Sequence, residues 1–267
     1  MDHRVRWAIY LVFAIALSIP LITGWQVPPD VGPEARQMYA AIERVPPDKI
    51  VLLNAMFEGS SLAENGPQTS ALIAHLMKRG KRFAIVGLDA IGPGLAQEIA
   101  EKAAGKYHRP YGETWCNWGY KLALPAVVMG LARDLPGSVV KDIKGTAFAS
   151  IPAMKGVKRA EDVGLVIDIS PTSSFSAWLM YFTGPHHVPL AVAPTSVMIS
   201  EIYPFMNTGQ IVGMLKGIAG AAQYERLIDE PGDGYKNRMP VFMAHAVIIG
   251  LILLGNLGEI LRRRRLR

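Results

Sequence analysis

The sequence contains a single cysteine, Cys116, among 267 residues. One thiol cannot form an internal disulfide, and without a CxxC pair the chain has no cysteine metal site or redox couple of that kind. The lone cysteine does not identify the compartment, because an exported domain can fold without disulfides.

Motifs that name a reaction are also missing. No GxGxxG follows a candidate strand, and no GxxxxGK[ST] loop or GxSxG nucleophile elbow occurs. Gly92-Pro93-Gly94 is too short for a phosphate loop, and proline lacks the amide hydrogen that a phosphate would accept. We therefore expect no nucleotide and no other cofactor.

The net charge of +6 is confined to the two ends of the chain. Arg4 and Arg6 come before the first apolar run, and Arg262–Arg265 and Arg267 follow the last one. Between these ends the acidic and basic residues almost balance. This distribution argues against a nucleic-acid-binding face and indicates membrane topology or contact with lipid headgroups.

Two long apolar runs, 7–24 and 239–261, are each able to cross about 30 Å of hydrocarbon as a helix. We predict transmembrane helices over 1–25 and 239–261. Because clustered arginine stays on the cytoplasmic side, we expect both termini and the arginine tail, 262–267, to be cytoplasmic. The protein would lie in the inner (cytoplasmic) membrane, with residues between the spans in the periplasm or outside the cell.

Alternatives exist for both runs. The first has the basic head and apolar middle of a cleaved signal peptide, and Pro20 would kink or end a helix there. In the last run His245, Asn256 and Glu259 are polar. Polar residues within a span usually face another helix or a cavity, so we favour helix packing over a proton pathway, which would need more partners.

Residues 26–48 are rich in proline at both ends, with a short helix expected over Glu34–Arg44. This composition is typical of a stiff spacer, so we interpret the segment as a stalk or juxtamembrane collar outside the core.

Residues 49–230 alternate between apolar runs of strand length and segments with helical periodicity. The expected strands are Lys49–Phe57, Arg82–Leu88, Val163–Ile169 and Val188–Ala193. The expected helices are Pro67–Arg79, Pro93–Ala104, Leu124–Arg133, Phe175–Phe182 and Gln210–Ile228. This alternation predicts one Rossmann-like α/β domain with a parallel sheet.

The stretch Tyr107–Tyr120 does not fit the alternation and is interpreted as an insertion. It holds three tyrosines and two tryptophans, which are Tyr107, Tyr111, Trp115, Trp118 and Tyr120. Such side chains suit a binding surface, the membrane interface, or a satellite core beneath a loop.

Ligands of open parallel sheets bind beyond the carboxyl ends of the strands. Four loops follow such ends, at 58–61, 89–94, 170–174 and 194–196. The candidate ligand-binding residues in them are Glu58, Ser60, Asp89, Ser173, Ser174 and Thr195. The alternative is that these residues are present because serine, threonine, aspartate and glycine make turns and helix caps.

Residue types for covalent catalysis also occur, since Ser173 or Ser174 could act with Asp168 and one histidine of the pair His186-His187. The histidine pair could also be half of a metal site. Because no other histidine has ligand spacing, an exposed loop pair is the simpler interpretation, and we expect no metal.

Small residues recur every four positions at Gly209, Gly213, Gly217 and Ala221. On the expected helix they would form one ridge almost free of side chains, against which another backbone could pack closely. The partner could be this protein's own sheet or a second subunit. Lys216 also leaves a re-entrant or membrane-surface position open.

Three segments resemble an uncharacterised family of prokaryotic membrane-anchored proteins. They are ENGPQTSALIAHLMKRG at Glu64–Gly80, YGETWCNWGYK at Tyr111–Lys121 and YPFMNTGQIVGMLKGIAGAAQYE at Tyr203–Glu225. The last block has Thr208 where the family usually has serine, and Gln223 within its GAAEYE-type motif. The resemblance implies one α/β unit in the middle of the chain and no known activity.

From these features we expect a structural or binding subunit of an oligomeric membrane complex, either a homo-oligomer or part of a larger assembly. The main alternative is a small-ligand sensor or hydrolase-like enzyme that uses the crevice at the strand carboxyl ends. A catalytic residue cannot be assigned.

Overall fold

The computed structural model describes residues 3–122 and 125–265. Leu124, where the third predicted helix would begin, lies outside them, as do the first two and last two residues of the chain. The molecule consists of two compact units, residues 1–28 with 235–267, and residues 29–234. We call the second unit the body.

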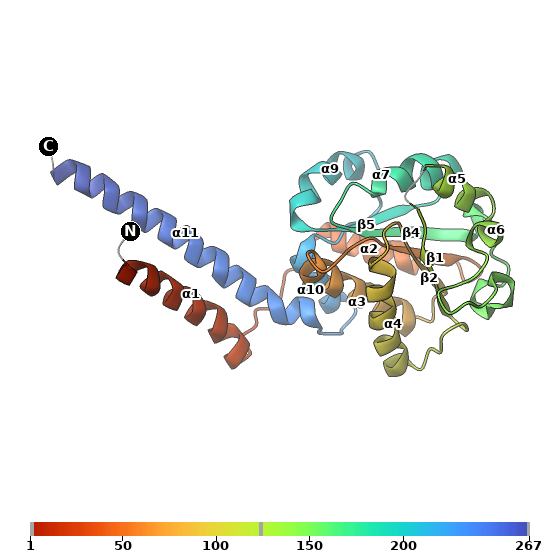
Figure 1. Cartoon of the computed structure of the whole chain (residues 1–267), viewed down its shortest axis with the longest axis horizontal. Helices are drawn as coiled ribbons and strands as arrows, with labels where there is room; N and C mark the ends of the chain where they lie inside the picture. The colour runs from red at the N-terminus through yellow and green to blue at the C-terminus, as the bar shows by residue number, and fades with distance from the viewer. Residues whose placement is uncertain (1–2, 123–124, 266–267) are drawn as a thin grey trace. The chain divides into compact units, whose positions relative to one another are not determined.

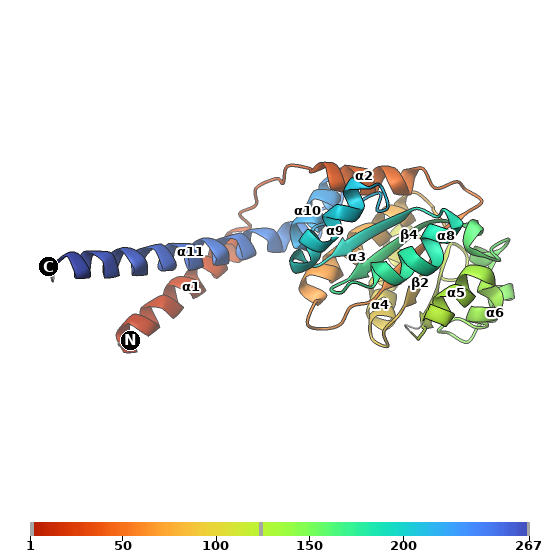
Figure 2. The ribbon, with the colours of Figure 1, turned by 90° about the horizontal axis from the view of Figure 1, so that it is seen from above.

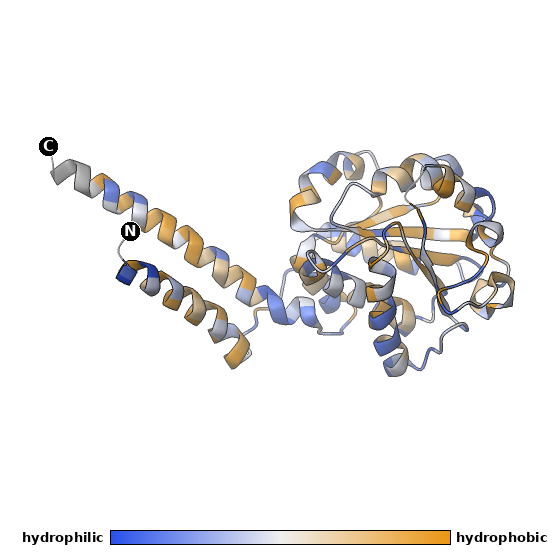
Figure 3. Cartoon of the chain, viewed as in Figure 1, coloured by the Kyte–Doolittle hydropathy of each residue, from blue (hydrophilic) through white to orange (hydrophobic). Residues whose placement is uncertain are grey.

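The first unit contains α1 (His3–Thr23) and most of α11 (Asp233–Arg265). Each has a stretch long and apolar enough to cross a membrane, at His3–Thr23 and Asp233–Ile260. Figure 3 shows the predominance of hydrophobic residues along both helices. Pro20 does not end α1. Within this unit Gln26 Nε2 and Arg238 Nη1 donate hydrogen bonds to the carbonyls of Lys236 and Val27, which join the segment after α1 to the start of α11.

The body is built on a five-stranded parallel sheet (Figure 1). Its strands are β1 (Ile50–Ala55), β2 (Phe83–Gly87), β3 (Trp115–Tyr120), β4 (Val163–Ser170) and β5 (Leu190–Pro194). Their order is β3-β2-β1-β4-β5, so the chain starts in the middle, winds outward to β3 and then returns to the other side of β1. Strands β1 and β4 are neighbours, and the winding direction changes between them, which is the usual ligand-binding position of such sheets.

Helices cover both faces of the sheet (Figures 1 and 2). One layer contains α2 (Pro33–Glu43), α3 (Leu62–Lys78), α4 (Gly92–Tyr107) and α10 (Gly217–Leu227). The other contains α5 (Pro125–Arg133), α6 (Leu135–Val139), α7 (Phe175–Trp178), a π-helical turn (Leu179–Thr183) and α9 (Ile199–Asn207), with the short α8 (Gly184–His186) leading into β5. Strand side chains alternate between the two cores, as Val51 and Leu52 do, so every strand is apolar along both faces.

The predicted insertion at Tyr107–Tyr120 is wrong, because its second half is the edge strand β3. Trp115 packs in one core and Trp118 in the other, both almost fully buried. The two tryptophans of the segment are therefore core residues of a strand, whereas Tyr120 at the end of β3 is exposed. Glycine and polar residues around them hid the strand pattern in the sequence.

The predicted stalk at 26–48 is also wrong in its central part. Helix α2 packs against the body, and Ala35, Met38 and Ile42 on one of its faces are buried. The two proline pairs lie in the segments before and after this helix, so the proline-rich composition belongs to the connections that flank a packed helix.

The predicted helix Gln210–Ile228 begins only at Gly217. Residues 211–215 run extended beside β5, where Val212 N donates to Leu190 O at 2.8 Å and Leu215 N donates to Val192 O at 3.0 Å. The glycines explain the difference, because Gly217 has a φ of +52° and glycine is a poor helix former. Gly209, Gly213, Gly217 and Ala221 consequently do not form a ridge on one helix.

Candidate functional site

The centre of the candidate site lies where β1 and β4 end. Asn54 of β1 and Asp168 of β4 are paired in the sheet register, and Asn54 Nδ2 donates a hydrogen bond to Asp168 Oδ1 at 2.5 Å. Ser174, at the start of α7, donates its hydroxyl to both Asp168 carboxylate oxygens at 2.9 and 2.8 Å. The carboxylate thus joins two strands and the loop after β4.

Asp168 is buried, with only 2% of its surface exposed. Burial raises the pKa of its carboxyl to about 6, and hydrogen bonds from Asn54, Ser174 and the Phe175 amide oppose that rise. A carboxyl group with this pKa has the acidity of a general acid or base, but its oxygens are already engaged by neighbours. The contacts make it foremost a residue that holds the β4–α7 turn in place.

The possible catalytic triad is not assembled. His186 Nδ1 bonds to Glu161 Oε1 at 2.9 Å, and both residues precede the amino ends of β5 and β4. Ser174 and Asp168 lie at the carboxyl end of β4, most of a strand length away. Ser173 instead donates to Glu201 Oε1 at 2.6 Å. The prediction joined residues from opposite edges of the sheet, which sequence distance alone does not reveal.

The remaining predicted ligand-binding residues do lie along the carboxyl edge, but in different roles. Ser60 donates to Glu58 Oε1 at 3.0 Å on the exposed loop after β1. Asp89 Oδ1 accepts from the amides of Ile91 and Gly92, both at 2.7 Å, so it makes the turn into α4. Thr195 is buried after β5. The contacts of Asp89 Oδ1 are therefore those of a turn-forming residue, which is the alternative role given for it from the sequence.

Several polar atoms near this edge are buried and have no hydrogen-bond partner among the described residues. They are Asn54 Oδ1, Asn65 Oδ1, Asp89 Oδ2 and Thr195 Oγ1. Each belongs to a strand end or to a loop or helix start just beyond one. Buried polar atoms are normally hydrogen-bonded, so three acceptor oxygens and one hydroxyl in this state along one edge favour a polar binding position there.

The glycine-rich segment contributes to the same edge through internal packing. A Cβ at Gly213 would lie 2.5 Å from the Met38 backbone nitrogen, and one at Gly217 would lie 2.2 Å from Glu64 Oε2. Glu64 Oε2 also accepts hydrogen bonds from the Ser196 amide and hydroxyl. These two glycines allow α2, α3 and the loop after β5 to meet within the body, a packing role other than the predicted helical ridge.

Two buried amides that the sequence did not single out hold this region together. Asn65 Nδ2 donates to Ala193 O at 3.1 Å, and Gln68 Nε2 reaches the carbonyls of Pro194 and Leu215, both at 2.9 Å. The first two turns of α3 thus hydrogen-bond to the end of β5 and to the strand-like segment before α10. The unusual run Asn65-Gly66-Pro67-Gln68 in a helix was the available signal.

A second missed cluster lies farther along α3. The ring of His75 is buried, with Nδ1 2.6 Å from Tyr224 Oη and Nε2 2.7 Å from Glu43 Oε1. Tyr39 stacks on the imidazole at 4.6 Å between ring centroids. Burial lowers the pKa of His75 despite the nearby Glu43 carboxylate. The cluster links α2, α3 and α10.

Exposed apolar side chains line the carboxyl edge. Each lies at the end of a strand or between that end and the next helix, and the set is Leu62, Ile91, Tyr120, Leu122 and Val197. Val197 is the most exposed, at 81%. We call these five residues the apolar rim. Carboxylates lie among them on the same loops and helix starts, at Glu58, Glu64, Asp89 and Glu201.

Comparisons with family models, curated proteins and solved structures give no match for this chain. Among the described residues, no three histidine, cysteine, aspartate or glutamate side chains gather as a metal site would require. The candidate site is therefore defined by its geometry, an acidic and partly apolar edge above a buried Asn54–Asp168 pair.

Proposed function

We propose that this protein is a membrane-anchored binding subunit, whose body lies on the extracytoplasmic side and presents the carboxyl edge of its sheet to a partner protein of the same membrane complex. The observation behind this proposal is the apolar rim. Its five exposed apolar side chains lie on the loops along one edge of the sheet, from β3 to β5, and exposed apolar side chains that share one face favour an interaction surface.

The charges beside the rim favour a particular kind of partner. Glu58 and Glu201 are exposed, Glu64 and Asp89 are half-buried, and Lys121 is a half-buried cation between two rim residues, so the edge is more acidic than basic as well as apolar. Two identical edges facing each other would bring like charges together. We therefore expect a surface with basic and apolar residues, from another protein or from a different face of another copy.

The first and last residues of the body lie close together, which supports anchoring by both terminal helices. Arg226 Nη1 donates to Pro29 O at 2.6 Å, next to the point where the chain enters the body. The neighbouring Glu225 accepts from the amides of Gly232 and Gly234, where the chain leaves it. Entry and exit are thus adjacent, as they must be if one membrane receives both terminal helices through short connections.

Site-specific photocross-linking in native membranes tests the proposal. A photoreactive residue at Val197 should give a discrete adduct with a second protein, whereas the same residue at the exposed Lys102 of α4 should not. Replacing Leu62 and Ile91 with serine should abolish the Val197 adduct while leaving the melting temperature unchanged. Identical adducts at both positions, or a strict monomer by native mass spectrometry of extracted membranes, would refute it.

The second candidate function is a small-ligand sensor or enzyme at the same edge. It is favoured by the buried polar atoms near the carboxyl ends of the strands that have no hydrogen-bond partner in the described part of the chain. Such acceptors suit a ligand rich in hydroxyl or amino groups. Thermal-shift measurements with glycerol, inositol and ethanolamine should then show stabilisation that Thr195→Val removes, and no stabilisation by any probe would count against a ligand of this class.

A further inference from the structure

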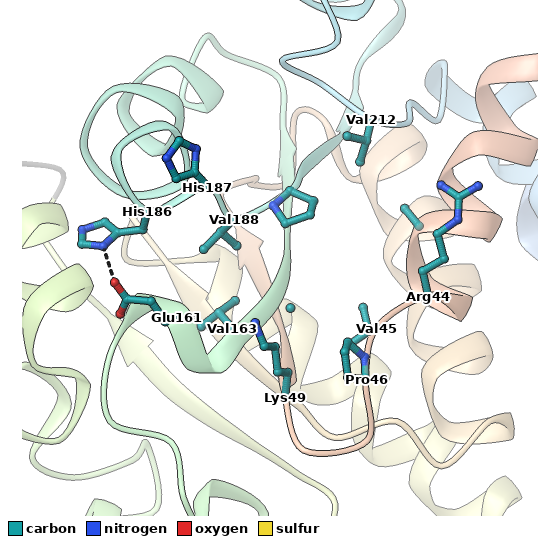
Figure 4. A pocket seen from close by; sticks show the side chains of 13 residues that line it. Arg44, Val45, Pro46, Lys49, Glu161, Val163, His186, His187, Val188 and Val212 are labelled. Atoms are coloured by element: carbon teal, nitrogen blue, oxygen red, sulfur yellow. Dashed lines mark hydrogen bonds and ion pairs between the residues drawn. The ribbon is translucent and has the colours of Figure 1, made fainter.

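A hollow lies at the amino edge of the sheet, opposite the candidate site (Figure 4). It has a volume of about 320 Å³, within the range of small-molecule sites. Lys49 lies just before β1, Val163 begins β4, and Pro189 lies just before β5. The hollow is therefore formed by the segments that enter the three strands, and it is separated from the apolar rim by the length of the sheet.

The walls of this hollow are mainly apolar, with Val45, Val163, Val188 and Val212 among the lining residues. The sheet is irregular beside the hollow. The pairing of β1 with β4 shifts between Ile50 and Val51, opposite Gly164. A Cβ at Gly164 would lie 2.7 Å from Val45 Cγ1. Glycine is therefore needed at this position, where the irregular start of β4 packs against Val45.

The polar groups of the hollow leave a surplus of positive charge. Glu161 is paired with His186 at 2.9 Å and with Arg159 at 3.3 Å. Within the part of the chain that the structure describes, Arg44 and Lys49 form no ion pair. The carbonyls of Glu43 and Val45 at the end of α2 accept hydrogen bonds from Lys81 Nζ.

The positions of the two cations differ. In Figure 4 Lys49 extends beside Val163 in the middle of the view, and Arg44 lies beyond Val45 on the side opposite the His186–Glu161 pair. Lys49 is half-buried and Arg44 is exposed. A charge in a partly desolvated position interacts more strongly with a ligand than one in open water does. Lys49 is therefore the better placed to bind an anionic group.

We propose that this hollow binds a small amphipathic anion, with its apolar part against the valines and its carboxylate or phosphate on Lys49. Arg44, on the side of the hollow opposite the His186–Glu161 pair, adds electrostatic attraction for the same anion. The site is independent of the proposed partner surface, because the two lie at opposite edges of the sheet and share no residue.

Titration calorimetry of the full chain in nanodiscs of a zwitterionic lipid, with empty nanodiscs as the reference, tests this proposal. The probes are 4-phenylbutyrate, phenyl phosphate and the uncharged 4-phenylbutanol. We expect the anions to bind more tightly than the alcohol, and the tighter anion identifies the preferred head group. Lys49→Gln should weaken anion binding about tenfold, because it removes one charge-assisted hydrogen bond. Arg44→Gln should weaken anion binding less.

Lys102→Gln on α4 is the matched control and should bind like the wild type. Val212→Phe, which fills the hollow without changing its charge, should weaken all three probes. Equal affinity for 4-phenylbutyrate and 4-phenylbutanol, unchanged binding by Lys49→Gln, or equal weakening by Lys102→Gln would overturn the proposal. Circular dichroism melting of each variant shows whether it is folded.

Discussion

Asn54 and Asp168 stand opposite each other on the two central strands, and the amide of the first donates to the carboxylate of the second at 2.5 Å. This pair joins the two halves of the sheet at the position where the winding direction changes. Ser174 completes the contact by tying the loop after β4 to the same carboxylate. A buried acid at this place makes the stability of the body sensitive to pH.

The first prediction concerns Asp168→Asn. The native pKa of about 6 is higher than the value of 3.8 for an unperturbed aspartate, so the folded state binds more protons between these values. The stability from this group is fully present below pH 4 and is lost as pH rises through 6. At ~1.4 kcal/mol per pKa unit, the wild type should lose up to about 3 kcal/mol relative to the variant between pH 4 and 7.

Thermal unfolding followed by fluorescence of the buried tryptophans, in detergent at several pH values, measures this difference. Glu98→Gln on the exposed face of α4 is the control for general charge effects. A constant gap between wild type and Asp168→Asn across this pH range would show that the carboxyl has no special environment.

The second prediction concerns His75→Leu. The substitution leaves Tyr224 Oη buried without its 2.6 Å partner, and Tyr224 has no exposed surface. An unsatisfied buried hydroxyl costs roughly 1–3 kcal/mol, so the melting temperature of the body should fall by several degrees. Tyr39→Phe is the control, because it keeps the ring stack and removes only the exposed hydrogen bond to Arg79.

The same histidine should affect acid stability in the opposite direction to Asp168. Burial lowers the pKa of His75 below 6.5, so the unfolded chain binds more protons once pH falls below that value. The body therefore loses stability from His75 as pH decreases, and His75→Leu should lose less than the wild type over that interval. Parallel acid-unfolding curves for the two proteins would contradict this assignment.

The third prediction concerns Gly213→Ala. The new Cβ would lie 2.5 Å from the Met38 nitrogen and 2.6 Å from its Cα, and backbone atoms cannot move aside cheaply. We expect destabilisation of about 1–3 kcal/mol, the usual cost of overpacking. Gly94→Ala is the control, since nothing lies within 4 Å of its Cβ position on α4 and alanine is the better helix former.

This pair also separates internal packing from subunit contact. Differential scanning fluorimetry reports stability, and native mass spectrometry of the extracted protein reports assembly. If Gly213→Ala dissociates an oligomer while the melting temperature stays unchanged, Gly213 belongs to an interface and the internal contact with Met38 is not the important one.

The fourth prediction concerns topology. Cys116 is buried, and burial raises the pKa of its thiol to about 12, so it should not react with a maleimide in the folded protein. Lys102→Cys should therefore be labelled by a membrane-impermeant maleimide in intact cells if the body is extracytoplasmic. Arg4→Cys should be labelled only after lysis, and the reverse pattern would place the body in the cytoplasm.

The strands β1, β2, β4 and β5 could be predicted because each is a short apolar run between turn residues, and burial on both faces leaves that mark in the sequence. Helices α3 and α4 were predicted from helical periodicity, although α3 begins earlier, at Leu62, and α4 ends later, at Tyr107. The two apolar terminal helices follow from composition alone. Local sequence patterns were sufficient to predict an element wherever its own apolar residues repeat with the period of a strand or a helix.

The carboxyl edge was predicted only in part. Asp89 and Thr195 lie where a parallel sheet requires the loops after its strands to be, which is a consequence of topology. Asn65, Gln68 and His75 were missed because each bonds to groups more than 100 residues away or on another helix, and no local pattern records such a partner. The aromatic strand β3 was missed because tryptophan and tyrosine side chains also pack beneath loops, so their presence does not distinguish a strand from a loop.

The amino-acid sequence by itself determined that this chain has two apolar ends with arginine beside them and an alternating α/β middle, because hydropathy and periodicity are local properties. Only the tertiary structure decided which residues meet. It placed His186 and Asp168 at opposite edges, put Gly213 against Met38, and gathered the apolar rim from four separate loops. These results depend on strand order, and strand order is set by long-range packing that no short segment contains.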